Sequence, residues 1–264
     1  MPRVFDFNSA IVRTPGRSVV DGLSASAGPK PVYEVVLAEH QGYIAALRAA
    51  GVDVTVLPPL EAFPDSVFVE DPALVFAEAA VLLRPGAPTR IAEAQELAPT
   101  LRARFSTVLT LSDGFADGGD ILVTPGRVLI GLSARTDEPG AAALAKLLES
   151  IDLESSVVRV PRGTLHLKTD CSLVDEETIL ATDTLARSGL LEGYRVLVVP
   201  DEERHATNAI RVNDVVFIRA GCPQTGGLLE RHGLNALPLP SSEIAKIDAG
   251  LSCMSLRWFD PPAR

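Results

Sequence analysis

Five short polar stretches contain the residues of this sequence whose types could do chemistry. They are Glu70-Asp71, Asp117-Gly118-Gly119-Asp120, His166-Leu167-Lys168, Asn208, and the end of Gly250-Leu251-Ser252-Cys253. Cys253 would supply a thiol nucleophile, and His166 would supply an imidazole for proton transfer. The carboxylates could bind a cationic group. Nucleophilic catalysis on a cationic substrate needs these groups in one place.

Each of these residues also has an ordinary structural explanation. A free cysteine usually behaves as a small buried hydrophobe. A histidine between two leucines, as at His166, is usually a core residue, and two aspartates around Gly118-Gly119 are typical of a tight turn. Catalysis is favoured only where the fold brings Cys253 and His166 together, whereas Cys171 and Cys222 are expected to be structural.

The predicted elements form one unit that recurs about five times. An apolar strand leads through a turn into a helical stretch, and a second strand follows. Leading strands are expected at 10–13, 81–84, 127–131, 179–182 and 215–218, helices at 32–50, 91–104, 140–150, 184–191 and 227–232, and closing strands at 52–56, 107–111, 157–160, 196–199 and 237–239. Pro99 is expected to break or kink the second helix.

A further short strand precedes most units, and turn residues typical of hairpins join it to the leading strand. These strands are expected at 73–76, 120–123, 171–174 and 209–212. The first unit has only residues 5–7 in that place, and a strand at 254–259 is left over. Pairing that strand with the N-terminal one would close the chain into a ring without an open edge.

This pattern predicts an α/β fold, a closed, roughly five-fold ring of β-β-α-β units with helices outside. An ordinary mixed α/β sandwich is the alternative. In the ring, the start of each hairpin strand faces the central axis. The five polar stretches, including Cys253 and His166, would then converge on one channel.

Composition and charge exclude several classes of protein. The chain has 264 residues, 47% of them hydrophobic, and a formal net charge of -10 without any basic run, which disfavours a nucleic-acid partner. No apolar run is long enough to span a membrane, and the start lacks the apolar core of a signal peptide. Three cysteines without zinc-type spacing suit a reducing compartment. We therefore expect a single catalytic domain over residues 1–264, a cytoplasmic location, and neither nucleic acid nor membrane as a partner.

Motifs along essentially the whole chain resemble those of the dimethylarginine dimethylaminohydrolase family. They are Phe63-Pro64-Asp65-Ser66-Val67-Phe68-Val69-Glu70-Asp71, Leu83-Arg84-Pro85-Gly86-Ala87-Pro88-Thr89-Arg90, Asp117-Gly118-Gly119-Asp120, Gly131-Leu132-Ser133-Ala134-Arg135-Thr136, Leu165-His166-Leu167-Lys168 and Gly250-Leu251-Ser252-Cys253. The resemblance implies the pentein fold, a five-bladed pseudo-symmetric α/β-propeller of the guanidine-modifying superfamily.

By the same resemblance, Cys253 corresponds to the nucleophile, His166 to the general acid and base, and Asp117 to the carboxylate that orients the histidine. The resemblance also implies seven substrate-binding positions. These are Asp65, Glu70 and Asp71 around the guanidinium, Arg90 and Arg135 at the α-carboxylate, Ile247 offering its backbone carbonyl to the α-amino group, and Leu23 in a lid loop.

The implied reaction is hydrolysis of Nω-methylated arginine to citrulline and methylamine or dimethylamine, through a thiouronium adduct on Cys253. It implies no metal and no organic cofactor, although zinc bound to Cys253 and His166 would inhibit. The expected partner is a small guanidine substrate, and a homodimer is left open. Phe68 is a candidate for the apolar wall beside the methyl group.

Three alternatives remain at this point. An arginine deiminase shares the fold and chemistry, but such enzymes carry an added helical region that this chain lacks. An amidinotransferase would pass the amidino group to an amine instead of water. A non-catalytic propeller, like the ribosome-associated translation factor of this fold, is disfavoured by the cysteine–histidine pair and the acidic balance.

Overall fold

Five small sheets of three strands each make up the described part of the chain, residues 2–25 and 28–261 of a computed structural model. In each sheet an antiparallel pair is followed by a parallel third strand, in the orders β15-β1-β2, β3-β4-β5, β6-β7-β8, β9-β10-β11 and β12-β13-β14. The fivefold repetition predicted from the sequence is confirmed.

The strand bounds follow the predicted ones closely, because apolar runs bounded by Pro, Gly and Asp residues form strands. They are β1 (Ser9–Arg13), β2 (Asp53–Leu57), β3 (Ala73–Val75), β4 (Ala79–Leu82), β5 (Thr107–Thr110), β6 (Ile121–Thr124), β7 (Arg127–Leu132), β8 (Ser155–Arg159), β9 (Cys171–Leu173), β10 (Thr178–Ala181), β11 (Arg195–Val198), β12 (Ile210–Val212), β13 (Val215–Arg219), β14 (Asn235–Leu239) and β15 (Leu256–Trp258).

The two ends of the chain close the ring. β15 pairs antiparallel with β1, and Ala10 lies opposite Arg257 in the register. β15 therefore takes the hairpin place in the first sheet, where residues 5–7 form no strand. The closure predicted from the leftover strand is confirmed, and it fixes the Cys253 segment next to the N-terminal sheet.

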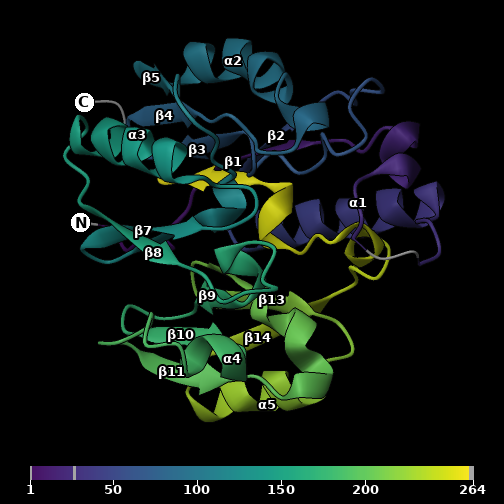
Figure 1. Cartoon of the computed structure of the whole chain (residues 1–264). Coiled ribbons are helices and arrows are strands. Elements are labelled where there is room, and N and C mark those ends of the chain that lie inside the picture. Colours follow the sequence, from purple (N-terminus) through teal and green to yellow (C-terminus); the bar gives the residue numbers. More distant parts are fainter. Residues whose placement is uncertain (1, 26–27, 262–264) are drawn as a thin grey trace.

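Helices lie outside the sheets (Figure 1). They are α1 (Tyr33–Ala49), α2 (Glu93–Arg104), α3 (Glu138–Glu149), the short α4 (Asp183–Ala186) and α5 (Pro223–Arg231). α2 continues through Pro99, so the expected break is wrong, while the alternative of a kink stays a prediction. Proline removes one helical hydrogen bond, but Leu97 and Leu101 on either side of it are buried against the sheet and hold the helix together. None of the helices in the described ranges is long and apolar enough to cross a membrane.

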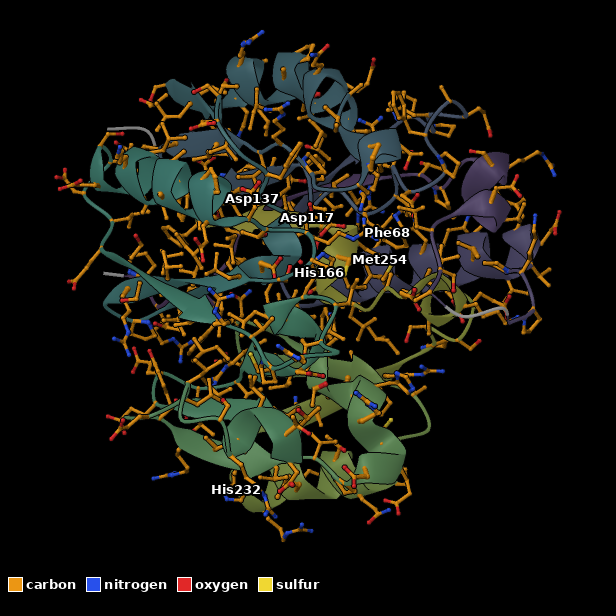
Figure 2. The ribbon with its side chains drawn as sticks, in the orientation of Figure 1. Phe68, Asp117, Asp137, His166, His232 and Met254 are labelled. Atoms are coloured by element: carbon orange, nitrogen blue, oxygen red, sulfur yellow. The ribbon has the colours of Figure 1, made fainter. Side chains whose placement is uncertain are left out.

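Short 3-10 turns precede the first strand of four sheets and carry most of the polar stretches. They are η3 (Gly118–Asp120), η4 (Leu167–Thr169), η5 (Asp201–Thr207) and η7 (Ser252–Met254), ahead of β6, β9, β12 and β15. Asp117 and His166 consequently lie near the middle of the molecule, while His232, at the end of α5, lies at its edge (Figure 2).

Candidate active site

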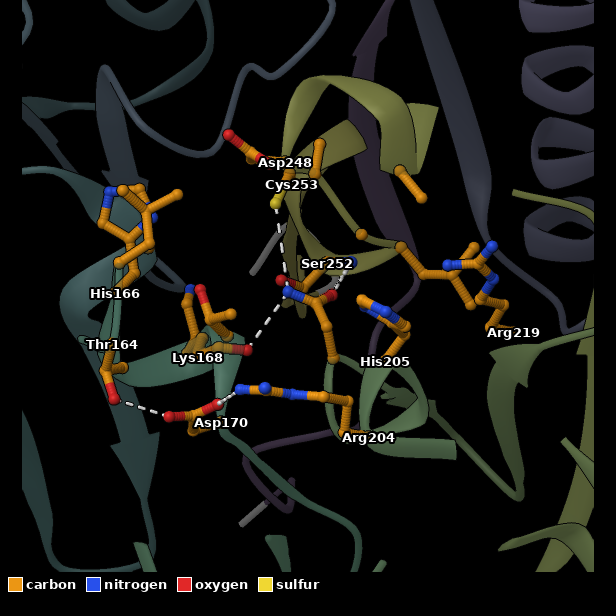
Figure 3. A pocket seen from close by; sticks show the side chains of 18 of the residues that line it. Thr164, His166, Lys168, Asp170, Arg204, His205, Arg219, Asp248, Ser252 and Cys253 are labelled. Carbon is orange, nitrogen blue, oxygen red and sulfur yellow. Dashed lines mark hydrogen bonds and ion pairs between the residues drawn. The ribbon is translucent and has the colours of Figure 1, made fainter. Parts of the chain in front are cut away.

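Cys253 and His166 line one pocket of about 260 Å³ at the centre of the ring (Figure 3). Cys253 lies in η7, and Asn208 ties this turn to the neighbouring sheets. The Asn208 side chain accepts a hydrogen bond from the Ser252 N–H at 3.0 Å and donates to the Lys168 carbonyl at 3.1 Å. A side chain on Gly250 would collide with Asn208, at 2.4 Å from its Oδ1, so the turn requires glycine there.

Asp117 orients His166. One Asp117 oxygen lies 3.1 Å from His166 Nε2, and the other accepts the Gly86 N–H at 2.7 Å. The imidazole rests on the backbone at Gly119, where a Cβ would lie 2.8 Å from His166 Cγ. Gly119 thus allows close packing of the histidine, while a Cβ on Gly118 would lie 1.9 Å from the Glu70 carbonyl oxygen.

Asp120 is buried and fixes the segment that carries His166. Its carboxylate accepts hydrogen bonds from the Leu167 N–H at 2.9 Å and from the hydroxyls of Ser133 and Thr136 at 2.7 Å each. Asp117 and Asp120 therefore have separate tasks, since the first contacts the imidazole and the second holds the backbone beside it.

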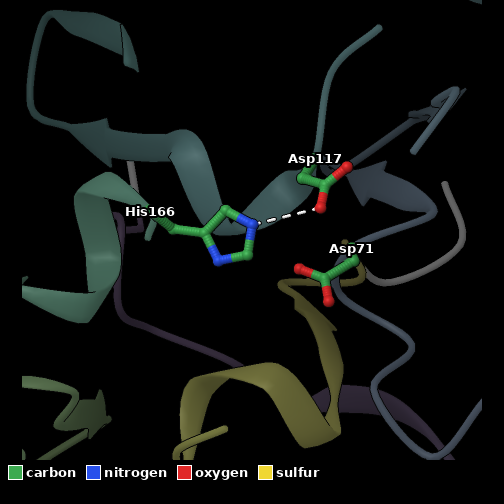
Figure 4. A group of neighbouring side chains, drawn as sticks. All are labelled: Asp71, Asp117 and His166. Atoms are coloured by element: carbon green, nitrogen blue, oxygen red, sulfur yellow. Dashed lines mark hydrogen bonds and ion pairs between the residues drawn. The ribbon is translucent and has the colours of Figure 1, made fainter. Parts of the chain in front are cut away.

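Asp71 lies beside the Asp117–His166 pair (Figure 4). Its carboxylate accepts the Gly119 N–H at 3.2 Å and pairs with Arg90. Arg90 is itself buried, and Glu93 accepts from its Nε at 3.0 Å and from its Nη2 at 2.7 Å. The Arg90 guanidinium is thus engaged within the protein, and its predicted contact with a substrate carboxylate stays a prediction.

The protonation states follow from burial and nearby charges. Burial raises the pKa of Cys253 to about 12, and the charges of Asp71 and Glu70 act in the same direction. Burial alone would lower the pKa of His166, but the hydrogen bond to Asp117 and the charge of Asp71 outweigh it and raise the pKa. The free site therefore holds a neutral thiol and favours a charged imidazole.

Carboxylates near the pocket differ in their pKa. Burial alone would raise the pKa of Asp71, but the cationic Arg90 and His166 hold it below its ordinary value. Burial raises the pKa of Asp65, which Arg90 only partly offsets. Of these two carboxylates, Asp71 is therefore the one kept ionised for a bound cation.

The predicted lid residue and its neighbours lie together. The Leu23 N–H donates to the Asp65 carboxylate at 3.0 Å, and a Cβ on Gly22 would lie 3.1 Å from the Ile247 side chain. Arg135 is partly exposed, and no hydrogen bond or ion pair of its guanidinium is found within the described ranges. The structure thus brings Leu23, Asp65 and Ile247 to one side, with Arg135 free to reach a ligand.

Glu70 has other partners than the resemblance implies. Its Oε1 pairs with Lys168 at 2.7 Å and with Arg257 at 3.0 Å, and the side chain is buried. Phe68 is buried in the same hydrophobic core as the pocket-lining Leu251, and its suggested role as an apolar wall stays a prediction. The Phe68 carbonyl accepts a hydrogen bond from Arg90 Nη2 at 3.1 Å.

Sequence reasoning missed three residues that line the outer part of the pocket, Arg204, His205 and Arg219. Arg204 and His205 lie in η5, four and three residues before Asn208, and Arg219 ends β13. Their position in the repeat could have indicated a place near the axis of the ring. Because arginine is usually exposed and histidine is intermediate in burial, their residue types gave no reason to distinguish them from ordinary surface residues.

Asp71, Asp117 and His166 also form a group whose ligand atoms lie within 4.8 Å of one another, close enough to hold a metal ion. Two of these side chains already bond to backbone N–H groups, and Asp71 also pairs with Arg90. Zinc binding by Cys253 and His166 stays a prediction.

Comparison with known proteins identifies the family. Residues 27–188 match the family described as N,N dimethylarginine dimethylhydrolase, eukaryotic. The N(G),N(G)-dimethylarginine dimethylaminohydrolase of Pseudomonas aeruginosa is 39% identical over 96% of this chain and 100% of its own length. The chain belongs to the dimethylarginine dimethylaminohydrolase family. A Streptomyces coelicolor protein with the same description is 30% identical over 94% of this chain and 96% of its own length.

Solved structures agree with the predicted fold. A Pseudomonas aeruginosa dimethylarginine dimethylaminohydrolase structure in complex with citrulline superposes with a TM-score of 0.92 and covers 96% of this chain and 100% of its own. The N-terminal domain of a cyanobacterial arginine dihydrolase, 19% identical, has a TM-score of 0.85 and covers 97% of this chain and 100% of its own, which shows the same fold. The fold is the five-bladed α/β-propeller of the family.

The chain also has a relative among the arginine deiminases, one of the alternative functions. An arginine deiminase of Mycobacterium tuberculosis is 30% identical, but over 54% of this chain and 37% of its own length. The match to the dimethylarginine enzymes is higher in identity and spans nearly the whole of both chains.

Proposed function

We propose that this protein hydrolyses Nω-methylated arginines to citrulline and methylamine or dimethylamine, with Cys253 as the nucleophile. The observation that carries the proposal is the arrangement of Cys253 and the Asp117–His166 pair around one pocket, in a chain of this family. Neither a metal nor an organic cofactor takes part in the proposed steps.

The substrate guanidinium binds next to Asp71, between the thiol and His166. A guanidinium is planar and donates several hydrogen bonds, so an ionised carboxylate is its natural partner. Its positive charge offsets the carboxylate charges that raise the pKa of Cys253. Substrate binding therefore promotes release of the thiol proton to solvent, since His166 is already protonated, and the reactive thiolate forms mainly when a cation is present.

The first half-reaction forms a thiouronium. The Cys253 thiolate bonds to the guanidinium carbon, and charged His166 gives its proton to the methylated nitrogen as the carbon–nitrogen bond breaks. The raised pKa of His166 keeps this proton available before attack. Methylamine or dimethylamine leaves as the neutral amine.

Water completes the reaction in the second half. Neutral His166 takes a proton from water, and the hydroxide bonds to the thiouronium carbon. The carbon–sulfur bond then breaks, the thiolate departs, and loss of the oxygen-bound proton leaves citrulline. Asp117 keeps the imidazole oriented through both halves by its 3.1 Å contact with Nε2.

Structures of relatives support these assignments. One is a cysteine-to-serine variant of the Pseudomonas aeruginosa enzyme with citrulline, and another is a histidine-to-glycine variant of a dimethylarginine dimethylaminohydrolase in an adduct with S-methyl-L-thiocitrulline. Cys253 and His166 are among the residues that line the pocket here. We extend the substrate-side roles of Leu23, Asp65, Arg135 and Ile247 to this chain as part of the same proposal.

The proposal also covers the organisation of the protein. Residues 1–264 would act as a single catalytic domain, since the first and last strands of the described chain complete one sheet. Three free cysteines suit a cytoplasmic location. A homodimer is tested by light scattering during gel filtration.

A substrate panel tests the function. We expect kcat/KM to be higher for asymmetric dimethylarginine and Nω-methylarginine than for arginine, with citrulline and the matching methylated amine released in equal amounts. If arginine is the best substrate and ammonia is released, the protein is a deiminase. If citrulline forms with none of the three, but an added amine takes up the amidino group, it is an amidinotransferase.

A further inference from the structure

Arg257 lies directly behind the turn that carries Cys253. Its Nη1 donates to the Ser252 carbonyl at 2.9 Å and to the Ser255 carbonyl at 2.6 Å, which lie on either side of Cys253 in the chain. The same nitrogen lies 2.7 Å from Ser255 Oγ. One guanidinium thus bridges the two ends of the nucleophile turn.

Glu70 completes this arrangement. Its Oε1 accepts from Arg257 Nη2 at 3.0 Å, and its Oε2 accepts from Ser252 Oγ at 3.0 Å. The Glu70 backbone N–H donates to the Cys253 carbonyl at 3.2 Å. Arg257 and Glu70 together therefore contact the turn at residues 252, 253 and 255.

The Arg257–Glu70 ion pair is buried, and two apolar side chains in its place would cost less desolvation free energy. The side chain of Arg257 is 12% exposed and that of Glu70 6%. Removing two charges from water costs free energy that the ion pair barely recovers, so a buried pair contributes little net stability. What a planar guanidinium offers that an apolar side chain lacks is a fixed fork of donors. Here Nη1 donates to the carbonyls on both sides of Cys253 while Nη2 donates to Glu70.

We propose that Arg257 is a positioning residue that holds the Cys253 sulfur in line with the substrate carbon. The inference rests on the proposed function, in which Cys253 attacks the guanidinium. Arg257 acts through the backbone of residues 252–255 and is not among the residues that line the pocket. A displacement of about 1 Å at a reacting atom can cost roughly 10²-fold in rate.

The substitution Arg257→Lys tests this role, because lysine keeps the charge but loses the fork. We expect kcat for Nω-methylarginine to fall by about 10²-fold while KM stays within about threefold. The matched control is Arg211→Lys. Arg211 also clamps backbone carbonyls, those of Val174 at 2.7 Å and Asn213 at 3.0 Å, but away from the pocket, and its kcat is expected to stay near wild type.

Alkylation of Cys253 by iodoacetamide, followed by intact mass across pH, separates positioning from unfolding and from loss of charge. Arg257→Lys should keep the pH dependence of alkylation and the melting temperature of the wild type while kcat falls. The milder Ser255→Ala removes one acceptor of Arg257 and should lower kcat in the same direction by a smaller factor. Ser255→Ala replaces Arg257→Lys as the test variant if Arg257→Lys does not fold.

Two results would overturn the inference. One is a kcat of Arg257→Lys within about threefold of wild type. The other is a loss of kcat that comes with an equal loss of alkylation and melting temperature, which marks a purely structural role. Failure of the proposed function looks different, because the wild type would then form no citrulline from Nω-methylarginine although Cys253 is alkylated normally.

Discussion

Two groups of charged residues at the central pocket differ in burial. The carboxylate wall (Asp65, Asp71, Asp117) lies outside the residues that line the pocket, and each of its residues is at most 5% exposed and bonded to a backbone N–H or an arginine. On the arginine wall (Arg204, His205, Arg219), the Arg204 side chain is 61% exposed, and its ion pair with Asp170 spans 3.9 Å.

This difference separates groups that are fixed before substrate arrives from groups that can adjust. Buried and fully bonded groups need no reorganisation during the reaction, and such preorganisation is a major source of catalytic rate. Exposed and loosely paired groups are screened by water and ions and contribute little. We therefore expect the carboxylate wall to determine chemistry and stability, and the arginine wall to have small effects.

The largest effect is expected between the walls, at Cys253. Cys253→Ser should lower kcat for Nω-methylarginine by on the order of 10⁴-fold or more, because a hydroxyl is a far weaker nucleophile than a thiolate. Citrulline formation measures this loss. Cys222→Ser is the control and should keep most of the activity, since Cys222 lies at the start of α5, away from the pocket. Substantial turnover by Cys253→Ser would refute the mechanism.

Asp117→Asn on the carboxylate wall should lower kcat by about 10²–10⁴-fold, the range for a disturbed acid–base group. The change also removes contributions that raise the pKa of His166, so the effect of burial gains weight and the pKa falls. His166 would then lose its proton at lower pH, and the alkaline limb of the kcat profile, which reports the substrate complex with its thiolate formed, should move to lower pH. An unshifted limb would show that another group carries this proton.

Arg90 is a buried arginine and Arg135 a partly exposed one, and the two are compared by substitution. Arg90→Gln leaves Asp71 and Glu93 without their partner, which for a buried ion pair costs about 3–5 kcal/mol in the free energy of unfolding, measurable by urea denaturation.

Arg135→Gln should leave the free energy of unfolding unchanged and raise KM for Nω-methylarginine by about tenfold, which is roughly the loss of one charged hydrogen bond. Equal KM effects for an alkylguanidine without a carboxylate would contradict the assigned role of Arg135.

The smallest effect is expected on the arginine wall. Arg204→Gln should change kcat/KM by less than about threefold, since exposed ion pairs contribute roughly 0–1 kcal/mol. The measurement is repeated at low and high salt, where any residual difference should shrink. A loss as large as that of Asp117→Asn would show that the two walls are not functionally distinct.

The sequence by itself determined the repeat and the place of the polar stretches. Strand and helix periodicity are local properties, so the five units could be recognised without knowing their packing. The leftover strand at the C-terminal end indicated closure, and β15 pairs with β1 as expected. The place of Cys253 and His166 at equivalent points of the repeat then followed from geometry, because equivalent points of a closed ring face one axis.

Only the tertiary structure decided which charges pair with one another. Arg90 is bound to Asp71 and Glu93, and Glu70 to Lys168 and Arg257, a partner 187 residues away. Such pairings depend on distances of a few ångström between segments far apart in the chain, and residue type alone allows many of them. The raised pKa of Cys253 has the same origin, because burial and the nearness of Asp71 exist only in the folded protein.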